Sequence, residues 1–148
     1  MDYFELLEAF EAQVVKYDEL FNTNLDDMAL DNRILKEALK SQMSLMVQWE
    51  VMTKRFNYLF DECEVLVEEE YANALKAAMN DKYKEIMISE AKEYAKSNPT
   101  YKTVRRLQNK IRHSRDESRG LLEAIHSRKY IMNNMVQSIV ANVENHIL

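Results

Sequence analysis

The chain almost lacks the two residues that most often interrupt secondary structure. Its 148 residues contain one glycine, Gly120, and one proline, Pro99. Because turns and loops depend heavily on these two residue types, long uninterrupted helices are expected. Apolar residues make up 47% of the sequence and charged residues 30%, a composition that can supply a core and that fits a soluble folded protein. We therefore predict an all-α protein.

Hydrophobic spacing predicts where the helices lie. A 4-3-4-3-4 repeat of apolar side chains predicts an N-terminal helix over 2–22, with a loop at Asn22–Asn24. A long helical segment is expected over 27–80, capped by Asp26, Asp27 or Asp31. Ordinary globular helices run about 8–20 residues. This segment therefore either bends back on itself or builds an extended helical hairpin or a coiled-coil-like assembly.

The chain after residue 80 divides at its proline. The short segment 82–97 is ambiguous: Glu85 to Ile88 could be extended, and Ser89 could cap a short helix. Asn98 precedes Pro99 and is pushed out of the helical conformation, whereas Pro99 suits the first turn of a following helix. A last helix is predicted over 99–148. The expected fold is an elongated helical hairpin or bundle with a long C-terminal helix, forming one compact domain.

Charge is distributed unequally about that proline. Residues 1–98 hold 11 Lys and Arg against 21 Asp and Glu, a net charge of −10. Residues 99–148 hold 9 against 4, a net charge of +5. The sequence thus predicts an acidic helical body, 1–98, and a basic amphipathic C-terminal helix, 99–148.

An apolar seam runs along the C-terminal helix. From Val104 to Ile139 its members step by three and four residues, with Ser114, Ser118 and Arg128 among them. Such a heptad-like seam favours self-association, and the following residues are predicted to carry it: Leu121, Ile125, Met132, Met135 and Ile139. Packing of the same seam inside a monomeric bundle fits the periodicity equally well.

Seven cations gather in the first part of this helix, opposed only by Asp116 and Glu117. They are Lys102, Arg105, Arg106, Lys110, Arg112, Arg115 and Arg119. Helical geometry is expected to place 110 and 115 on one side of the seam and the others on the opposite side. A groove lined in this way can follow a phosphate backbone. From charge clustering alone we predict phosphate contacts by Arg105, Arg106, Lys110 and Arg112.

Aromatic residues near the cations offer a second means of binding nucleic acid. Tyr101, Tyr58 and Trp49 could present ring faces on which bases stack. The alternative is that Tyr58 and Trp49 belong to the core, because they lie on or beside the apolar face. The cations could likewise form a solvated surface or pair with the acidic body, in particular with Glu62, Glu64, Glu68, Glu69 and Glu70.

Residues 122–132, with the sequence LEAIHSRKYIM, resemble the C-terminal signature of the phage UvsY recombination mediators. That signature runs Leu, an acid, Ala-Ile, any residue, Ser-Arg, any residue and an aromatic residue, with a glycine just before it, as Gly120 is here. A weaker similarity covers Leu35 to Leu59, where the family carries a basic pair before an aromatic residue. Lys54, Arg55 and Phe56 match that pattern.

The resemblance implies a non-catalytic function and several partners. Proteins of this family bind single-stranded DNA, assemble into ring-like homo-oligomers and help a recombinase displace single-strand-binding protein. By resemblance, Lys54 and Arg55 would contact phosphates, and the setting would be the cytoplasm of a phage-infected cell. Assembly would multiply a weak basic surface, which offsets the net charge of −5. A competing hypothesis is an all-helical adaptor or virion structural protein that binds protein partners.

Other functional classes find little support in the sequence. One glycine cannot build a phosphate-binding loop. The single Glu-x-x-His, Glu123 to His126, lacks the second copy that a di-iron bundle needs. We therefore predict no enzymatic activity, no metal and no cofactor. The acidic N-terminus and the absence of a long uncharged stretch predict neither a signal peptide nor a membrane span. The lone Cys63 fits a reducing cytoplasm.

Overall fold

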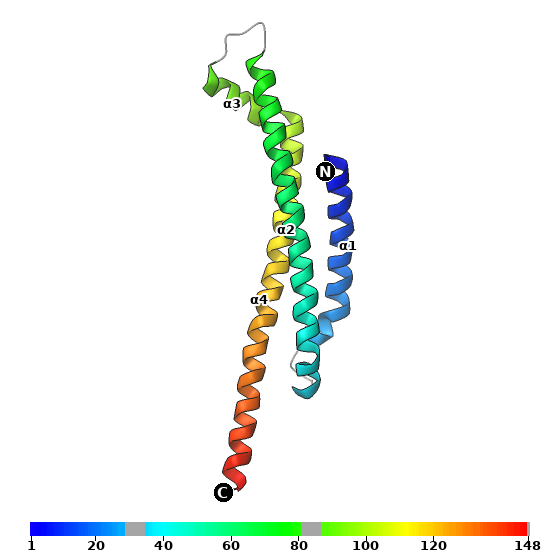
Figure 1. The fold of residues 1–148 in the computed structure, drawn as a ribbon, viewed down its shortest axis with the longest axis vertical. Coiled ribbons are helices and arrows are strands. Elements are labelled where there is room, and N and C mark those ends of the chain that lie inside the picture. The colour runs from blue at the N-terminus through cyan, green and yellow to red at the C-terminus, as the bar shows by residue number, and fades with distance from the viewer. Residues whose placement is uncertain (29–34, 81–86, 148) are drawn as a thin grey trace. The chain divides into compact units, whose positions relative to one another are not determined.

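The computed structural model describes residues 1–28, 35–80 and 87–147, with the side chains at 26–28 and 146–147 excepted. The described residues form four helices and no strand, which confirms the all-α prediction. The helices are α1 (Tyr3–Met28), α2 (Leu35–Met79), α3 (Ile88–Ser97) and α4 (Pro99–Ile147). Figure 1 shows them in chain order from blue to red.

Helix α1 is longer than the spacing predicted. It begins with a capping box in which the backbone N–H of Glu5 donates to Asp2 Oδ1 at 2.8 Å and that of Asp2 to Glu5 Oε2 at 3.1 Å. It then continues to Met28, so the predicted loop at Asn22–Asn24 is wrong. Asn24 is buried, and its side-chain amide donates to Gln48 Oε1 of α2 at 2.7 Å. That tertiary contact outweighs the preference of asparagine for turns.

Helix α2 runs 45 residues from Leu35 to Met79 without bending back on itself. The short helix α3 begins at Ile88, and its N-cap residue is Met87, which makes no side-chain capping bond. The predicted cap at Ser89 is therefore wrong, since Ser89 lies inside the helix. The predicted caps at Asp26 and Asp27 are wrong, because both residues lie inside α1. The predicted cap at Asp31 and the residues Glu85 and Ile86 lie outside the described residues.

Helix α4 begins where the proline predicts. The side chain of Asn98 accepts from the backbone N–H groups of Thr100 and Tyr101 at 2.9 and 3.1 Å, and Pro99 occupies the first helical position. The helix continues for 49 residues to Ile147. Gly120 does not interrupt this helix, and its φ is not positive.

The helices build two compact units, and these do not coincide with the predicted division at Pro99. Unit 1 comprises Met1–Val15 and Arg55–Arg115, and unit 2 comprises Lys16–Lys54 and Asp116–Leu148. Each unit combines parts of α1, α2 and α4, because amphipathic helices bury their apolar stripes against one another rather than against chain neighbours.

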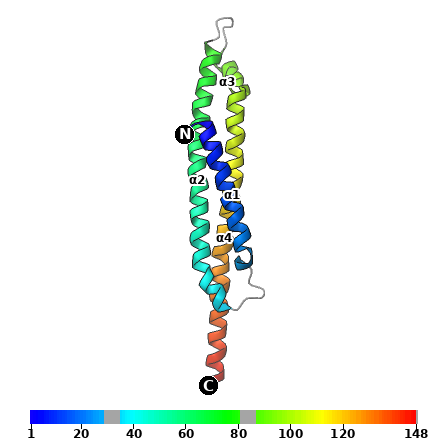
Figure 2. The same ribbon diagram turned by 90° about the vertical axis from the view of Figure 1, so that its right-hand side faces the viewer.

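In unit 1 the three helices meet along a core of aromatic and aliphatic side chains. Phe10 of α1 packs edge-on against Phe56 of α2 with the ring centroids 6.3 Å apart. Val104, Leu107 and Ile111 of α4 are buried. Helix α3 adds only Ala91 and Ala95 to the buried residues. The ribbon views show α2 and α4 side by side in this unit (Figures 1 and 2).

Unit 2 is held by aromatic packing and by buried hydrogen bonds between α2 and α4. Trp49 is fully buried and meets Tyr17 of α1 edge-on at 5.4 Å. Gln42 Nε2 donates to the backbone carbonyl of Ile125 at 2.7 Å. The hydroxyl of Thr53 donates to the carbonyl of Trp49 at 2.8 Å and lies 2.7 Å from that of Ser118. Ser118, a small polar residue of the seam, thus joins α4 to α2 of the same chain.

Cys63 is buried in unit 1, where its Sγ donates to the carbonyl of Val104 at 3.8 Å. Burial raises the pKa of this thiol from 9.0 to about 11.

We expect slow alkylation of Cys63 by iodoacetamide at pH 7.5 and rapid alkylation after denaturation. The protonated thiol should make its full contribution to the free energy of unfolding below pH 9. That contribution should decline between pH 9 and 11, because the thiol ionises at lower pH in the unfolded chain than in the folded one. Rapid alkylation of the folded protein would contradict this environment.

Candidate nucleic-acid interface

In unit 1 the charges are segregated by helix. The α4 residues 99–115 contain six Lys and Arg and no Asp or Glu. The α2 residues 55–79 contain two Lys and Arg against six Asp and Glu, and the α1 residues 3–15 contain only acidic charges. A strongly cationic helix segment therefore packs beside an acidic one, and the net charge of the whole chain conceals this local field.

Five cations of α4 form no ion pair with the acidic helix among the described residues. Helix α2 carries Glu62, Glu64, Glu68, Glu69 and Glu70, and within the described ranges none of them forms an ion pair with α4. Glu62 instead lies 4.0 Å from the α-amino group of Met1. Nor does any described carboxylate pair with these α4 side chains: Lys102, Arg105, Arg106, Lys110 and Arg112. For these five side chains, pairing of the basic helix with the acidic body thus finds no support in the part of the chain that is described.

The predicted phosphate contacts on α4 divide between two surfaces. Arg112 and Arg105 lie about 20° apart around the helix axis, whereas Arg106 and Lys110 are turned about 120° and 160° from Arg112. Arg106 and Lys110 continue a row with Lys102 at four-residue spacing, and all three are exposed. Counting charges along the sequence identified the cationic segment of α4 but did not separate these two faces.

The predicted placement of Arg112 and Arg115 on opposite sides of the seam is wrong. Both guanidinium groups lie over the ring of Phe60 of α2, at 5.6 Å and 4.3 Å from its centroid. Residues three apart are neighbours on a helix surface, which explains the shared ring. Phe60 is half-buried, and hydrophobic spacing alone could not reveal its cationic neighbours.

Neutral side chains orient two of these arginines. Arg105 donates to Gln108 Oε1 at 2.7 Å, and Arg112 donates to Asn109 Oδ1 at 3.4 Å. A neutral amide acceptor fixes a guanidinium without cancelling its charge. The arginines consequently keep their electrostatic attraction for a polyanion while losing some of their conformational freedom.

The residues predicted on α2 are partly available. Lys54 and Arg55 are both exposed. Lys54 belongs to unit 2 and Arg55 to unit 1. Tyr58 is 55% exposed, but Trp49 is 0% exposed and cannot offer a face to a base. Tyr101 is half-buried and tilts against Tyr71 with the centroids 5.6 Å apart. Among the three proposed stacking residues, Tyr58 has the most accessible ring.

The residues predicted to carry assembly separate into buried and exposed groups. Ile125 and Met132 are buried within unit 2, and Leu121 is half-buried. Met135 and Ile139 are 45% and 53% exposed, and Val140 and Val143 beside them are exposed as well. A contact between copies through Ile125 or Met132 would require unit 2 to open, whereas the C-terminal turns of α4 present an accessible apolar face.

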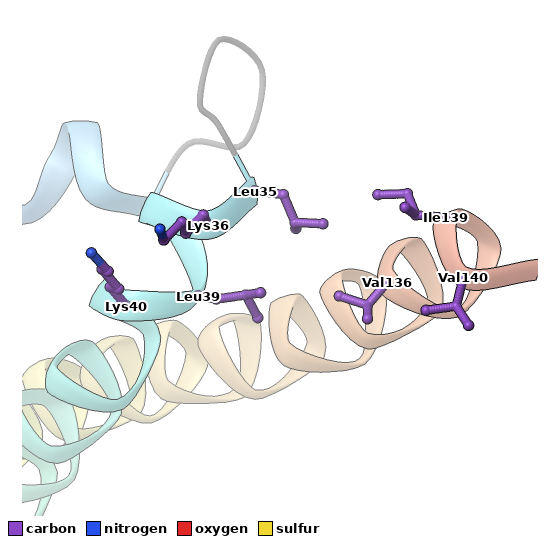
Figure 3. A pocket seen from close by; sticks show the side chains of 7 residues that line it. All are labelled: Leu35, Lys36, Leu39, Lys40, Val136, Ile139 and Val140. Atoms are coloured by element: carbon purple, nitrogen blue, oxygen red, sulfur yellow. The ribbon is translucent and has the colours of Figure 1, made fainter. Parts of the chain in front are cut away.

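An apolar pocket of about 510 Å³ lies in unit 2, where α2 begins. In Figure 3, Leu35 and Leu39 of α2 point toward Val136, Ile139 and Val140 of α4. Lys36 and Lys40 also line this pocket. Its floor is thus aliphatic and its edge cationic.

Features that would indicate other chemistry are few. Within the described ranges, no group of three or more His, Cys, Asp or Glu is placed to hold a metal ion. His126 of the lone Glu-x-x-His lies 3.9 Å from Glu50. Of the helices in the described part of the chain, none combines the length and the hydropathy needed to cross a membrane.

Comparison of the sequence with protein-family models and with curated proteins, and of the structure with solved structures, found no match.

Proposed function

We propose that the chain is a recombination mediator. In this proposal it binds single-stranded DNA and assists the loading of a recombinase onto DNA that is covered by single-strand-binding protein. The observation that carries the DNA-binding part is the cationic segment 99–115 of α4, which has six Lys and Arg and no acid. The mediator part rests on the resemblance of residues 122–132 to the UvsY signature.

Physical reasoning favours a single strand over a duplex as the ligand. A cationic helix segment together with the exposed ring of Tyr58 suits a flexible strand whose bases are free to stack. Tyr58 lies three residues after Arg55, so both side chains project from neighbouring positions on α2. Backbone contacts of this kind give affinity without sequence preference, which a mediator acting on any exposed strand requires.

Assembly completes the proposal. The net charge of −5 opposes tight binding by a single copy, but several copies on one strand act at high effective concentration. The exposed residues Met135, Ile139 and Val143 give α4 an apolar face through which copies could associate into a ring-like homo-oligomer. The cationic segment would then be repeated around the assembly.

Lys54→Ala/Arg55→Ala tests the α2 contacts. We expect weaker binding to labelled oligo-dT and a salt slope lower by about 1.4, because each lost phosphate contact on a single strand lowers it by about 0.7. Fluorescence anisotropy at several salt concentrations measures both quantities. Lys36→Ala/Lys40→Ala removes the same charge from the pocket edge and should leave the slope nearly unchanged. If both double variants lowered the salt slope equally, Lys54 and Arg55 would contribute only net charge and no phosphate contacts.

The experiment that tests the proposed function compares ligands rather than variants. Wild-type protein should bind oligo-dT more tightly than a duplex of equal length, and binding should weaken as salt increases. Indifference to both ligands in dilute buffer would overturn the proposal.

A second candidate function is favoured by the apolar pocket between Leu39 and Val140. Apolar grooves on helical proteins receive the apolar face of a partner helix. An adaptor or virion structural protein would use this groove and the exposed end of α4 to bind protein. Such a protein would form complexes with its partner but would show no preference for single strands in the anisotropy experiment.

A further inference from the structure

We propose that Phe60 holds Arg112 and Arg115 together as one phosphate-binding pair for the backbone of a single strand, with Phe60 as a positioning residue. The inference rests on the proposed function, because it names the site that would carry part of the DNA binding. It adds Arg115 and Phe60 to the predicted contacts.

The first step is the convergence of two like charges. The guanidinium carbons of Arg112 and Arg115 lie 5.6 Å and 4.3 Å from the centroid of the same ring. Both distances are within the range at which a cation is attracted to an aromatic face. Like charges three residues apart on a helix repel one another, and the ring compensates for that repulsion. A bound anion between them would relieve it further.

No acidic partner among the described residues neutralises Arg112. Arg112 forms no ion pair with any described carboxylate, and its polar partner is the neutral Asn109. Glu64 lies one turn after Phe60 on α2, yet it forms no ion pair in the described part of the chain. The α4 residues 99–115 contribute no acid. The positive charge of Arg112 is consequently available to an external anion.

The third step is the geometry of the guanidinium group. Its planar face can rest on an aromatic ring while its N–H donors point outward in the plane. Two donors of one arginine match two oxygens of a phosphate. Contact with Phe60 therefore occupies the part of the side chain that phosphate does not need. It also restricts rotamers before binding, which lowers the entropic cost of ordering a long side chain.

The chemistry identifies the ligand as a phosphodiester backbone rather than a base. Because two guanidinium groups already lie over Phe60, the ring is poorly available for stacking. The pair would contact the backbone of a strand and leave its bases free to stack elsewhere. A strand without bases should therefore still depend on Arg112 and Arg115.

The test uses the full-length chain and labelled oligo-dT. Arg112→Ala/Arg115→Ala should lower the salt slope by about 1.4, and the same loss should appear with an abasic oligonucleotide of equal length. Lys76→Ala/Lys96→Ala removes two exposed cations of unit 1 and serves as the matched charge control. It should bind nearly as wild type does. Equal effects of the two double variants would overturn the site.

Variants of Phe60 separate positioning from charge. Phe60→Leu keeps an apolar side chain but removes the ring, and affinity should fall about three- to tenfold while all cations remain. Phe60→Tyr retains the ring and should restore binding. Thermal unfolding of both variants shows whether unit 1 is intact. If Phe60→Leu unfolds cooperatively and binds as wild type does, the positioning role is refuted.

The outcomes distinguish this inference from the proposed function. Wild-type protein that binds oligo-dT with single-strand preference, together with an Arg112→Ala/Arg115→Ala variant that binds equally well, overturns the phosphate pair alone. Wild-type protein that binds neither oligo-dT nor the abasic strand overturns both.

Discussion

Trp49→Ala is expected to lower the free energy of unfolding by about 3–5 kcal/mol, the usual loss when a large aromatic side chain is removed from a core. Trp49 is 0% exposed and packs edge-on against Tyr17. Burial, followed by the carboxylates of Glu117 and Asp18, raises the pKa of that half-buried tyrosine. Urea denaturation followed by circular dichroism measures the loss, which is a large fraction of a typical domain's stability.

Two further variants separate a core role from a role in base stacking. Trp49→Phe keeps an aromatic ring and removes the indole Nε1, which is buried without a hydrogen-bond partner among the described residues. It should remain folded and bind oligo-dT as wild type does. Tyr58→Ala, at a ring that is 55% exposed, should instead weaken binding with little change in stability. If a folded Trp49→Phe protein bound DNA more weakly, Trp49 would have to take part in DNA binding after all.

How far the fold could be predicted depended on what each residue contacts. The scarcity of glycine and proline predicted all-α structure, and Asn98–Pro99 predicted the start of α4, because both effects act locally along the backbone. The continuation of α1 through Asn22–Asn24 could not be predicted. It depends on the part-buried hydrogen bond between Asn24 and Gln48, whose two residues are distant in sequence.

The candidate site shows the same division. Charge counting located the cationic segment of α4, because the density of lysine and arginine is a property of the sequence. It could not show that Arg112 and Arg115 share the ring of Phe60, because that contact joins α4 to α2. Nor could the hydrophobic spacing show which part of the α4 seam is buried by other helices and which part is exposed. Buried and half-buried residues up to Met132 and exposed residues from Met135 onward follow one repeat.

That change in burial along the seam guides the assembly experiment. The heptad-like spacing continues past Met132, while the turns of α4 beyond it expose Met135, Ile139 and Val143. Residues 133–145 contain one charged side chain, Glu144. An exposed face with little charge and β-branched side chains suits association between identical helices. The same helix would thus serve the fold in its middle and assembly at its end.

Met135→Asp/Ile139→Asp is expected to reduce the particle mass in mass photometry while leaving thermal unfolding nearly unchanged, because both side chains are exposed in the single chain. Met132→Asp places a charge at a position that is 0% exposed, and it should destabilise unit 2 by about 4 kcal/mol or more. Smaller particles from the first variant would also bind oligo-dT more weakly, since fewer cationic segments would be linked. An unchanged mass for folded Met135→Asp/Ile139→Asp would exclude the end of α4 from the interface.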